Sequence, residues 1–220
     1  MNLVQLPLNF ASEKLLLTNQ RALYWERERT LVLSDLHLGK AAHFRKNGIA
    51  IPAQVTHSDL FRLERLLQHY PTERLLIVGD LIHAGKNSEI ELLYGLVQKF
   101  PSTRFLLIKG NHDRLTDTLL QKIGVHQVHD SLTIGPLKFS HEPDIHSETY
   151  NICGHIHPGV RLKMPDRSNI SLPCFAVTHK TLVLPAFSHF TGLHTRYGTK
   201  DTAYFAITDN ALFSLKNPIL

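Results

Sequence analysis

Short apolar runs alternate with longer amphipathic segments along the chain. Four of these runs end in polar residues: 30–35, 74–80, 104–111 and 150–155. Because each run is short and rich in Leu, Ile, Val or Phe, we predict a buried strand at each. Between the first three runs, 53–70 and 88–100 carry apolar residues at three- and four-residue intervals, which predicts two helices. Pro71 and Pro101 follow these segments as stop signals.

From about residue 125 onward the pattern changes, and short strands predominate. Their apolar runs are "GPLKFSH", "ISLPCFAV", "TLVLPAF", "TAYFAIT" and "ALFSL". We therefore predict a mostly antiparallel sheet in the second half. Strands and helices in this order are typical of α/β and layered α+β domains. No repeat, low-complexity tract or linker interrupts the pattern, so we expect a single domain over 1–220.

Composition narrows the class of protein only slightly. The chain has 220 residues and a hydrophobic content of 43%, which is enough for one domain with a large core. It lacks the ~18 consecutive apolar residues of a membrane-spanning helix, and we expect a cytoplasmic protein. Cys153 and Cys174 lie in apolar runs and are expected to be reduced core residues. A net charge of +5 is compatible with nucleic acid as a partner but is weak evidence for it.

Residues of the types that bind metals follow the predicted strands, each at the point where its strand ends. They are Asp35 and His37, Asp80, Asn111 with His112 and Asp113, His141, and His155 with His157. In sheets of this kind ligands bind beyond the carboxyl ends of the strands, so these side chains are expected to meet. Taken singly, each has a structural explanation as a turn former, a helix cap or a buried histidine. Five strand ends that carry such residues together indicate a site.

The first pair suggests how this site is built. If the chain stays extended, Asp35 and His37 face the same side and both reach one ion. Hydrolysis of a phosphate ester brings a nucleophile to an anion, and two cations ~3.5–4 Å apart neutralise the charge of that step. Such a pair needs a shared carboxylate, and Asp80 at the end of a central strand is the best candidate. Mixed oxygen and nitrogen donors suit Mn²⁺, Fe²⁺ or Zn²⁺.

The motifs "DLH", "GDLIHAG", "GNHD", "SHEP" and "GHIHPG" resemble the five blocks of the calcineurin-like metallophosphoesterases, over residues 30–160. The resemblance implies a two-sheet β-sandwich flanked by helices. It implies two divalent metal ions, with Mn²⁺ favoured and Fe²⁺, Zn²⁺ or Mg²⁺ as alternatives, and Asp80 between them. The other implied ligands are Asp35, His37 and His157 for one ion, and Asn111, His141 and His155 for the other.

The resemblance also assigns a catalytic role next to the ligands. His112 projects over the scissile phosphate and donates a proton or hydrogen bond to the leaving oxygen. Asp113 either orients the His112 imidazole or caps a helix that begins near Arg114. Of the remaining histidines, His83 and His189 are expected to lie nearest the metals.

Within this superfamily, "SDLHLGKAAHFRKNGIAIP" and "LPCF" resemble the ligase-associated DNA damage response endonuclease (PdeM) family of bacteria. This narrower resemblance implies a nuclease that acts on DNA, with DNA ligase or helicase as repair partners. Lys40 and Arg45, in the loop after the first ligands, and Arg161, after the last pair, are candidates for holding a phosphate backbone. Solvated surface charge is the alternative for each of the three.

Two alternatives to a nuclease stay open on the sequence. The same metal site serves a phosphodiesterase or phosphatase that acts on a small nucleotide or another soluble phosphoester. A metal-binding scaffold without catalysis is the second alternative. A phosphoprotein substrate is disfavoured, because protein Ser/Thr phosphatases of the superfamily have Asp-Arg-Gly and Arg-Gly-Asn-His-Glu where this chain has "GDLIHAG" and "KGNHD".

Overall fold

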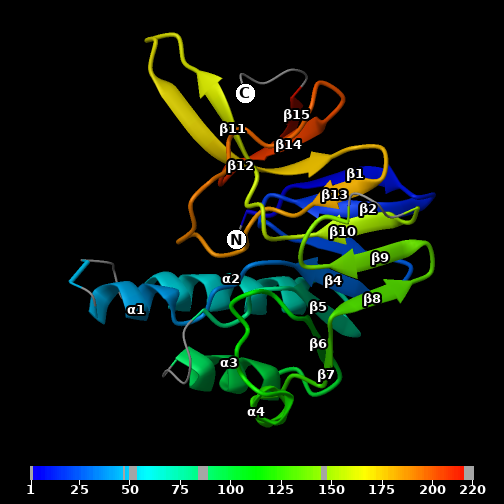
Figure 1. Cartoon of the computed structure of the whole chain (residues 1–220), viewed down its shortest axis with the longest axis vertical. Coiled ribbons are helices and arrows are strands. Elements are labelled where there is room, and N and C mark those ends of the chain that lie inside the picture. The colour runs from blue at the N-terminus through cyan, green and yellow to red at the C-terminus, as the bar shows by residue number, and fades with distance from the viewer. Residues whose placement is uncertain (1, 47, 50–53, 84–88, 145–147, 216–220) are drawn as a thin grey trace.

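Two β-sheets packed face to face form the centre of the protein, and helices cover the outer face of one of them (Figure 1). The structure is a computed structural model that describes residues 2–46, 48–49, 54–83, 89–144 and 148–215. The predicted two-sheet sandwich flanked by helices is confirmed. None of the helices in these ranges is long and apolar enough to cross a membrane.

The first sheet has seven strands, which lie side by side in chain order. They are β1 (Gln5–Phe10), β2 (Glu13–Thr18), β3 (Leu23–Trp25), β4 (Thr30–Leu33), β5 (Arg74–Val78), β6 (Arg104–Ile108) and β7 (Gln127–His129). The first four pair antiparallel, whereas β4 to β7 run parallel to one another. β4, β5 and β6 are predicted strands, and β1, β2 and β3 are additional to the prediction.

Alternate residues of the central strands point to opposite sides of the first sheet and fill two cores. In β5, Leu75 and Ile77 face the helices, whereas Leu76 and Val78 face the second sheet. β4 and β6 alternate in the same way. Parallel strands that are covered on both faces need near-continuous apolar runs. Polar side chains are therefore confined to the ends of these strands.

Two helices pack on the outer face of the first sheet at the predicted positions, α2 (Gln54–His69) and α3 (Glu89–Gln98). A third helix, α1 (Lys40–Lys46), lies where the prediction has a loop. It follows directly from the first pair of candidate ligands, and Phe44 on α1 contacts the Phe190 ring at a centroid distance of 5.5 Å. The prediction of a loop at this place is wrong.

The short helix α4 (Asp117–Lys122) follows β6. Its cap is Thr116, whose side chain accepts a hydrogen bond from the N–H of Leu119. The alternative in which Asp113 caps a helix beginning near Arg114 is therefore wrong, because the helix begins further along the chain.

The second sheet follows the strand order β15-β14-β12-β13-β10-β9-β8, with β11 paired to β12 outside this path. Its strands are β8 (Ser131–Ile134), β9 (Leu137–Ser140), β10 (Tyr150–Cys153), β11 (Gly159–Lys163), β12 (Asn169–Val177), β13 (Thr181–Val183), β14 (Ala203–Ile207) and β15 (Leu212–Leu215). Its strand pairs are antiparallel except those that β10 forms with β9 and β13. The prediction of a mostly antiparallel sheet is confirmed. Cys153 and Cys174 are free and buried, as expected.

Candidate metal centre

Asp35 and Asp80 follow β4 and β5, two neighbouring parallel strands of the first sheet. Their exposed fractions are 0% and 3%, and His37 is 4% exposed. The backbone is not extended here, because Asp35, His37 and Asp80 have φ angles of +54°, +52° and +48°. The expectation that an extended chain points Asp35 and His37 to the same side is therefore wrong. Left-handed backbone brings both side chains to the centre instead.

The same backbone conformation occurs at the ends of the second sheet. His155 and His157 follow β10 and have φ angles of +65° and +51°, and His141 follows β9. A left-handed residue that has a Cβ costs about 1–2 kcal/mol. Such residues persist only where the surrounding structure holds them, and they cluster at functional sites. Of the ten non-glycine residues with a positive φ angle in the described chain, five are candidate ligands of this centre, and the other five lie in turns elsewhere.

Imidazoles from the two sheets meet the carboxylates at these strand ends. Nε2 of His157 lies 3.3 Å from Nε2 of His37 and 3.3 Å from Oδ1 of Asp35. Nε2 of His141 lies 3.6 Å from Oδ1 of Asp80. Each of these sets draws on both sheets, so the centre forms only where the sheets come together.

Two groups of candidate ligand atoms result, each with its atoms within 4.8 Å of one another. The groups are Asp35, His37 and His157, and Asp35, Asp80 and His141. His155 lies beside the second group, with its Nδ1 3.1 Å from Nε2 of His141. Asp35 belongs to both groups, whereas Asp80, the carboxylate that the sequence analysis expects to be shared, belongs to the second group.

Backbone N–H groups from distant parts of the chain hold both carboxylates in place. The N–H of His155 donates to Oδ2 of Asp35 at 3.1 Å, and the N–H of His112 donates to Oδ1 of Asp80 at 2.9 Å. The other oxygen of Asp35, Oδ1, is buried and accepts no hydrogen bond from the described residues. A buried charged oxygen without a donor is costly. A cation at this position would satisfy it.

Two glycines allow side chains to approach the backbone closely. A Cβ at Gly79, where φ is +83°, would lie 1.7 Å from Nδ1 of His141. A Cβ at Gly110 would lie 2.2 Å from Oδ1 of Asp80. These glycines of the "GD" and "GNHD" motifs therefore leave the space that the ligand side chains occupy.

Burial and neighbouring charges set the protonation of the first pair of ligands. Burial opposes ionisation of Asp35, but contact with His157 and the charges of the other histidines hold its pKa below the ordinary value. Burial, together with the charge of Lys40, lowers the pKa of His37 to about 3. At neutral pH Asp35 is therefore ionised and His37 is neutral. These are the forms in which carboxylates and imidazoles bind metals.

The residues of this centre fit divalent cations. Two nitrogens bound to one ion at about 2.1 Å lie about 3.0–3.4 Å apart, and the two histidine pairs are separated by 3.3 and 3.1 Å. Carboxylate oxygens and imidazole nitrogens without a thiolate suit Mn²⁺, Fe²⁺ or Zn²⁺.

The predicted ligand Asn111 has a partner that the sequence analysis missed. Its side-chain N–H donates to Oε1 of Glu142 at 3.2 Å. Because this bond uses the nitrogen of the amide, the oxygen is the donor that Asn111 has for a cation. Glu142 follows His141 directly in the "SHEP" motif, and this adjacency was the signal available in the sequence.

His112 is exposed beside the ligands, among other imidazoles. Its ring centroid lies 4.4 Å from that of His83 and 6.0 Å from that of His37. Burial, with the charge of His112 adding to it, lowers the pKa of His83 to about 4. The structure thus places His83 next to the ligands, as expected.

Asp113 contacts the backbone of two loops. Its carboxylate accepts hydrogen bonds from the N–H of Ile82 at 2.9 Å and from the N–H of Gly110 at 3.0 Å. Within the part of the chain that the structure describes, no hydrogen bond joins Asp113 to the His112 ring. Asp113 therefore fixes the loops after β5 and β6, and the predicted contact with the imidazole is not observed.

His189 belongs to neither group of candidate ligands. Its Nδ1 lies 2.9 Å from Oδ1 of the buried Asp59. The preceding residue, Ser188, donates its backbone N–H to the carbonyl oxygen of Asp35 at 3.2 Å. The segment after β13 therefore supports the backbone of a ligand.

The three predicted substrate-binding residues lie in different surroundings. Lys40 is half-buried, and the charges of Asp35 and Asp80 only partly offset the lowering of its pKa by burial. Arg45 lies with Nη2 3.7 Å from Oε1 of the buried Glu89, which neutralises part of its charge. Arg161 is exposed on β11, four residues beyond His157. Of the three, Lys40 adjoins the candidate ligands, because its backbone N–H donates to the carbonyl oxygen of His37 at 3.1 Å.

Comparison with known proteins gives a family and one extensive structural match. The family model of the calcineurin-like phosphoesterases matches residues 28–170, a range that includes every predicted ligand. The crystal structure of the nuclease MPE from Pseudomonas putida is 27% identical with a TM-score of 0.82, covering 96% of this chain and 100% of that one. No curated protein matches the chain.

Two further solved structures are too dissimilar to carry an argument. A protein of unknown function from Aquifex aeolicus is 22% identical with a TM-score of 0.42, covering 58% of this chain and 78% of its own. A conserved uncharacterized protein from Streptococcus pneumoniae is 13% identical with a TM-score of 0.31, covering 84% of this chain and 86% of its own. The family match, together with the two groups of ligands, decides the classification. The chain belongs to the calcineurin-like phosphoesterase family and is a metal-dependent phosphoester hydrolase.

Proposed function

We propose that this hydrolase is a phosphodiesterase that acts on nucleic acid, as a nuclease on DNA, with two Mn²⁺ ions. The observation that carries the proposal is the match to a nuclease over the whole length of that protein, at 27% identity and a TM-score of 0.82. Both sheets contribute to the candidate centre, and a match that covers 96% of this chain includes both of them.

The ligands in this proposal are Asp35, His37 and His157 for one ion and Asn111, His141 and His155 for the other, with Asp80 shared. When bound, two cations would supply positive charge for the phosphate oxygens and would lower the pKa of a water molecule, so that hydroxide is available as the nucleophile at neutral pH. The bonds from backbone N–H groups keep Asp35 and Asp80 oriented, so these carboxylates need not reorganise during the reaction.

His112 is the proposed proton donor to the leaving oxygen. Its imidazole is exposed and within ring contact of His37 and His83, and its backbone N–H is bonded to Asp80. This bond ties the position of the donor to the position of a ligand. Asp113 acts as a positioning residue, because it fixes the loop that carries His112 through Gly110.

Lys40, Arg45 and Arg161 are the proposed contacts to the phosphate backbone of the substrate. Lys40 begins α1 three residues after the ligand His37, and Arg161 lies on β11 four residues after the ligand His157. Residues that bind backbone phosphates position the nucleic acid without reading its sequence. A role in the DNA damage response and partners such as DNA ligase or helicase are proposed on the family resemblance alone, and a cytoplasmic location stays a prediction from the sequence.

The test is an assay panel in Mn²⁺ with single-stranded DNA, duplex DNA, bis-p-nitrophenyl phosphate and p-nitrophenyl phosphate. We expect cleavage of DNA, and faster turnover of the small diester than of the monoester. The Asp80→Asn variant measured in parallel shows that the activity belongs to this centre. Faster turnover of the monoester with no cleavage of DNA would overturn the nuclease proposal and favour a small phosphoester.

A further inference from the structure

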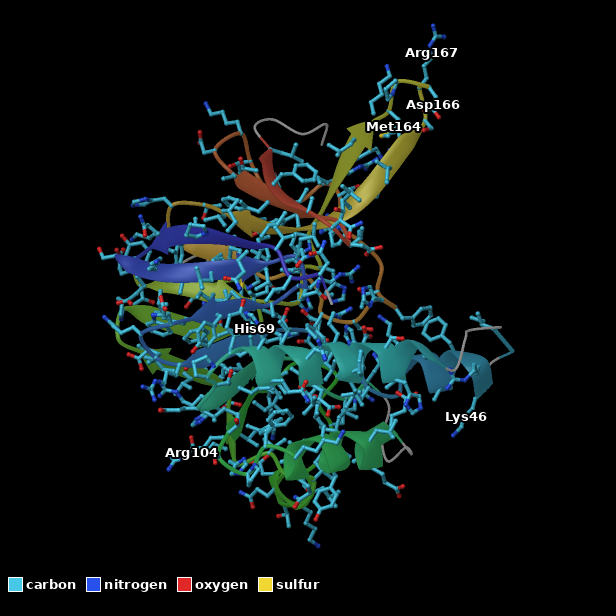
Figure 2. All side chains as sticks on the ribbon, turned by 180° about the vertical axis from the view of Figure 1, so that it is seen from behind. Lys46, His69, Arg104, Met164, Asp166 and Arg167 are labelled. Carbon is cyan, nitrogen blue, oxygen red and sulfur yellow. The ribbon has the colours of Figure 1, made fainter. Side chains whose placement is uncertain are left out.

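A two-stranded ribbon projects from the second sheet directly after the last predicted ligand. It consists of residues 159–173, in which β11 pairs antiparallel with the first half of β12. Figure 1 shows the ribbon reaching away from both sheets, and Figure 2 shows Met164, Asp166 and Arg167 at its tip, extending into solvent. Every residue from 163 to 171 is exposed. A two-stranded ribbon buries too little surface to be stable alone. Packing in the hydrophobic core therefore does not account for the presence of this projecting segment.

The two faces of the ribbon have different chemistry. Residues two apart on a strand, and residues opposite each other on paired strands, share a face. Arg161 and Lys163, with their partners Ser171 and Asn169, therefore form the outer part of one face, and all four side chains are polar. Leu162 and Ile170 are paired on the other face, which is apolar. We call the face with Arg161 and Lys163, together with Arg167 in the turn at the tip, the basic face of the ribbon.

Positive charges outnumber negative charges on the ribbon. Its outer part carries Arg161, Lys163 and Arg167 and a single carboxylate, Asp166. Asp166 accepts hydrogen bonds from the backbone N–H and the hydroxyl of Ser168, at 2.9 and 2.6 Å. None of the three cations forms an ion pair with any residue that the structure describes. Their charge is available for a polyanion.

The position of the ribbon relates this charge to the metal centre. A chain spans at most ~3.6 Å per residue, so Lys163 lies within about 22 Å of His157. A DNA strand rises by 3.4 Å per nucleotide. The upper limit of about 22 Å between His157 and Lys163 therefore corresponds to at most about six nucleotides. The basic face therefore begins beside a ligand and extends along the length of a short stretch of nucleic acid.

We propose that the basic face of the ribbon binds the phosphate backbone of a nucleic-acid strand whose scissile bond lies at the metal centre. This inference rests on the proposed nuclease function and deepens it, because it assigns Lys163 and Arg167 to substrate outside the reacting nucleotides. Arg167 lies at the tip of the ribbon, which extends into solvent, so a contact to it needs a substrate longer than a small diester (Figure 2). The ribbon thus discriminates a polymer from a small phosphodiester.

The test removes the two outer cations with Lys163→Gln and Arg167→Gln in one variant. With a 20-nucleotide single-stranded DNA in Mn²⁺, KM should rise about three- to tenfold while kcat stays unchanged. The slope of log(kcat/KM) against the logarithm of the salt concentration should become less negative by about 1.4. Each lost phosphate contact to a single strand contributes about 0.7 to this slope. KM for a four-nucleotide DNA and for bis-p-nitrophenyl phosphate should not change. Those two substrates also report whether the variant is folded.

The matched control removes the same charge with Lys14→Gln and Arg104→Gln, at the ends of first-sheet strands that lie opposite the metal centre. Both side chains are exposed, and Figure 2 shows Arg104 far from the tip of the ribbon. We expect this variant to behave as the parent does. An equal rise of KM in both variants would overturn the ribbon proposal in favour of general electrostatic attraction.

A second pair of variants tests which face of the ribbon binds DNA. Ser171→Lys adds a cation to the basic face and should lower KM for the long DNA, whereas Ile170→Lys adds it to the apolar face and should have little effect. Equal effects, or an unchanged KM in the first double variant while the parent cleaves DNA, would overturn the ribbon proposal and leave the nuclease intact. A parent that cleaves no DNA would overturn both.

Discussion

The two sheets contribute different chemistry to the metal centre. The first sheet provides the two buried carboxylates, Asp35 and Asp80, and each is held by a backbone N–H from another strand end. The second sheet provides histidines only, among them the half-buried His157. A carboxylate carries charge to the cations, and an imidazole adds a neutral donor. Losing a carboxylate of the first sheet should therefore cost more than losing a histidine of the second.

The largest effect is expected from Asp80→Asn, which removes the carboxylate that we propose the two ions share. Turnover of bis-p-nitrophenyl phosphate should fall more than about 10⁴-fold, and His157→Gln should cost about 10²–10³-fold. Glu13→Gln is the control, since Glu13 is a buried carboxylate bonded to Trp25 away from the centre. Metal content by mass spectrometry and the thermal midpoint Tm accompany the rates. Equal losses for Asp80→Asn and His157→Gln would contradict the proposed difference between the sheets.

The next effect concerns His112, which comes from the first sheet but is no ligand in this scheme. His112→Gln should keep both metals and slow hydrolysis by about 10²–10⁴-fold, the usual contribution of a positioned proton donor. The loss should be smaller for a nitrophenolate leaving group than for an alkoxide, because the former needs less protonation. His179→Gln, at an exposed histidine, serves as the control. Equal loss for both leaving groups would indicate that His112 positions the substrate.

A smaller effect is expected at Glu142, which orients a ligand of the first sheet from the second. Glu142→Ala removes the acceptor of the Asn111 side-chain N–H. Metal affinity measured by calorimetric titration should fall about 10–100-fold, as when a hydrogen-bond partner of a metal ligand is lost. Glu91→Ala on α3 should leave the affinity unchanged. An unaltered affinity in Glu142→Ala would show that Asn111 is oriented without its carboxylate partner.

The smallest effects are expected from two glycine-to-alanine substitutions, which should change the free energy of unfolding in opposite directions. Gly79→Ala places a Cβ against the His141 ring at a positive φ, and unfolding should become easier by about 1–3 kcal/mol. Gly95→Ala in α3 meets no atom within 4 Å, and it should stabilise the protein by about 0.5–1 kcal/mol. Urea denaturation measures both changes. Stabilisation by Gly79→Ala would contradict the close packing of His141 on the backbone.

The sequence pattern predicts the central strands and the long helices well, because both faces of β4, β5 and β6 are covered. It does not predict β1, where Pro7 interrupts the apolar pattern and is tolerated because the strand lies at the edge of the sheet. It also does not predict α1. Seven residues are too few for an amphipathic stripe, and a helix of that length depends on tertiary contacts such as that of Phe44 with Phe190.

The types and positions of the candidate ligands are visible in the sequence, but their backbone is not. Positive φ angles at Asp35 and His157 are unfavourable for any residue with a Cβ. They are imposed by contacts from distant segments, such as the bond from Ser188 to the Asp35 carbonyl. A single sequence shows residues of this kind only as ordinary turns, and the structure is needed to recognise them.

The contact between His37 and His157 joins residues 120 positions apart, and it has a consequence for folding. Contacts of such long sequence separation form late, because the chain between them must first lose entropy. No partly folded chain with one sheet has both halves of the centre. Ions that bind only the completed native state should therefore raise Tm with concentration while leaving the rate of folding nearly unchanged.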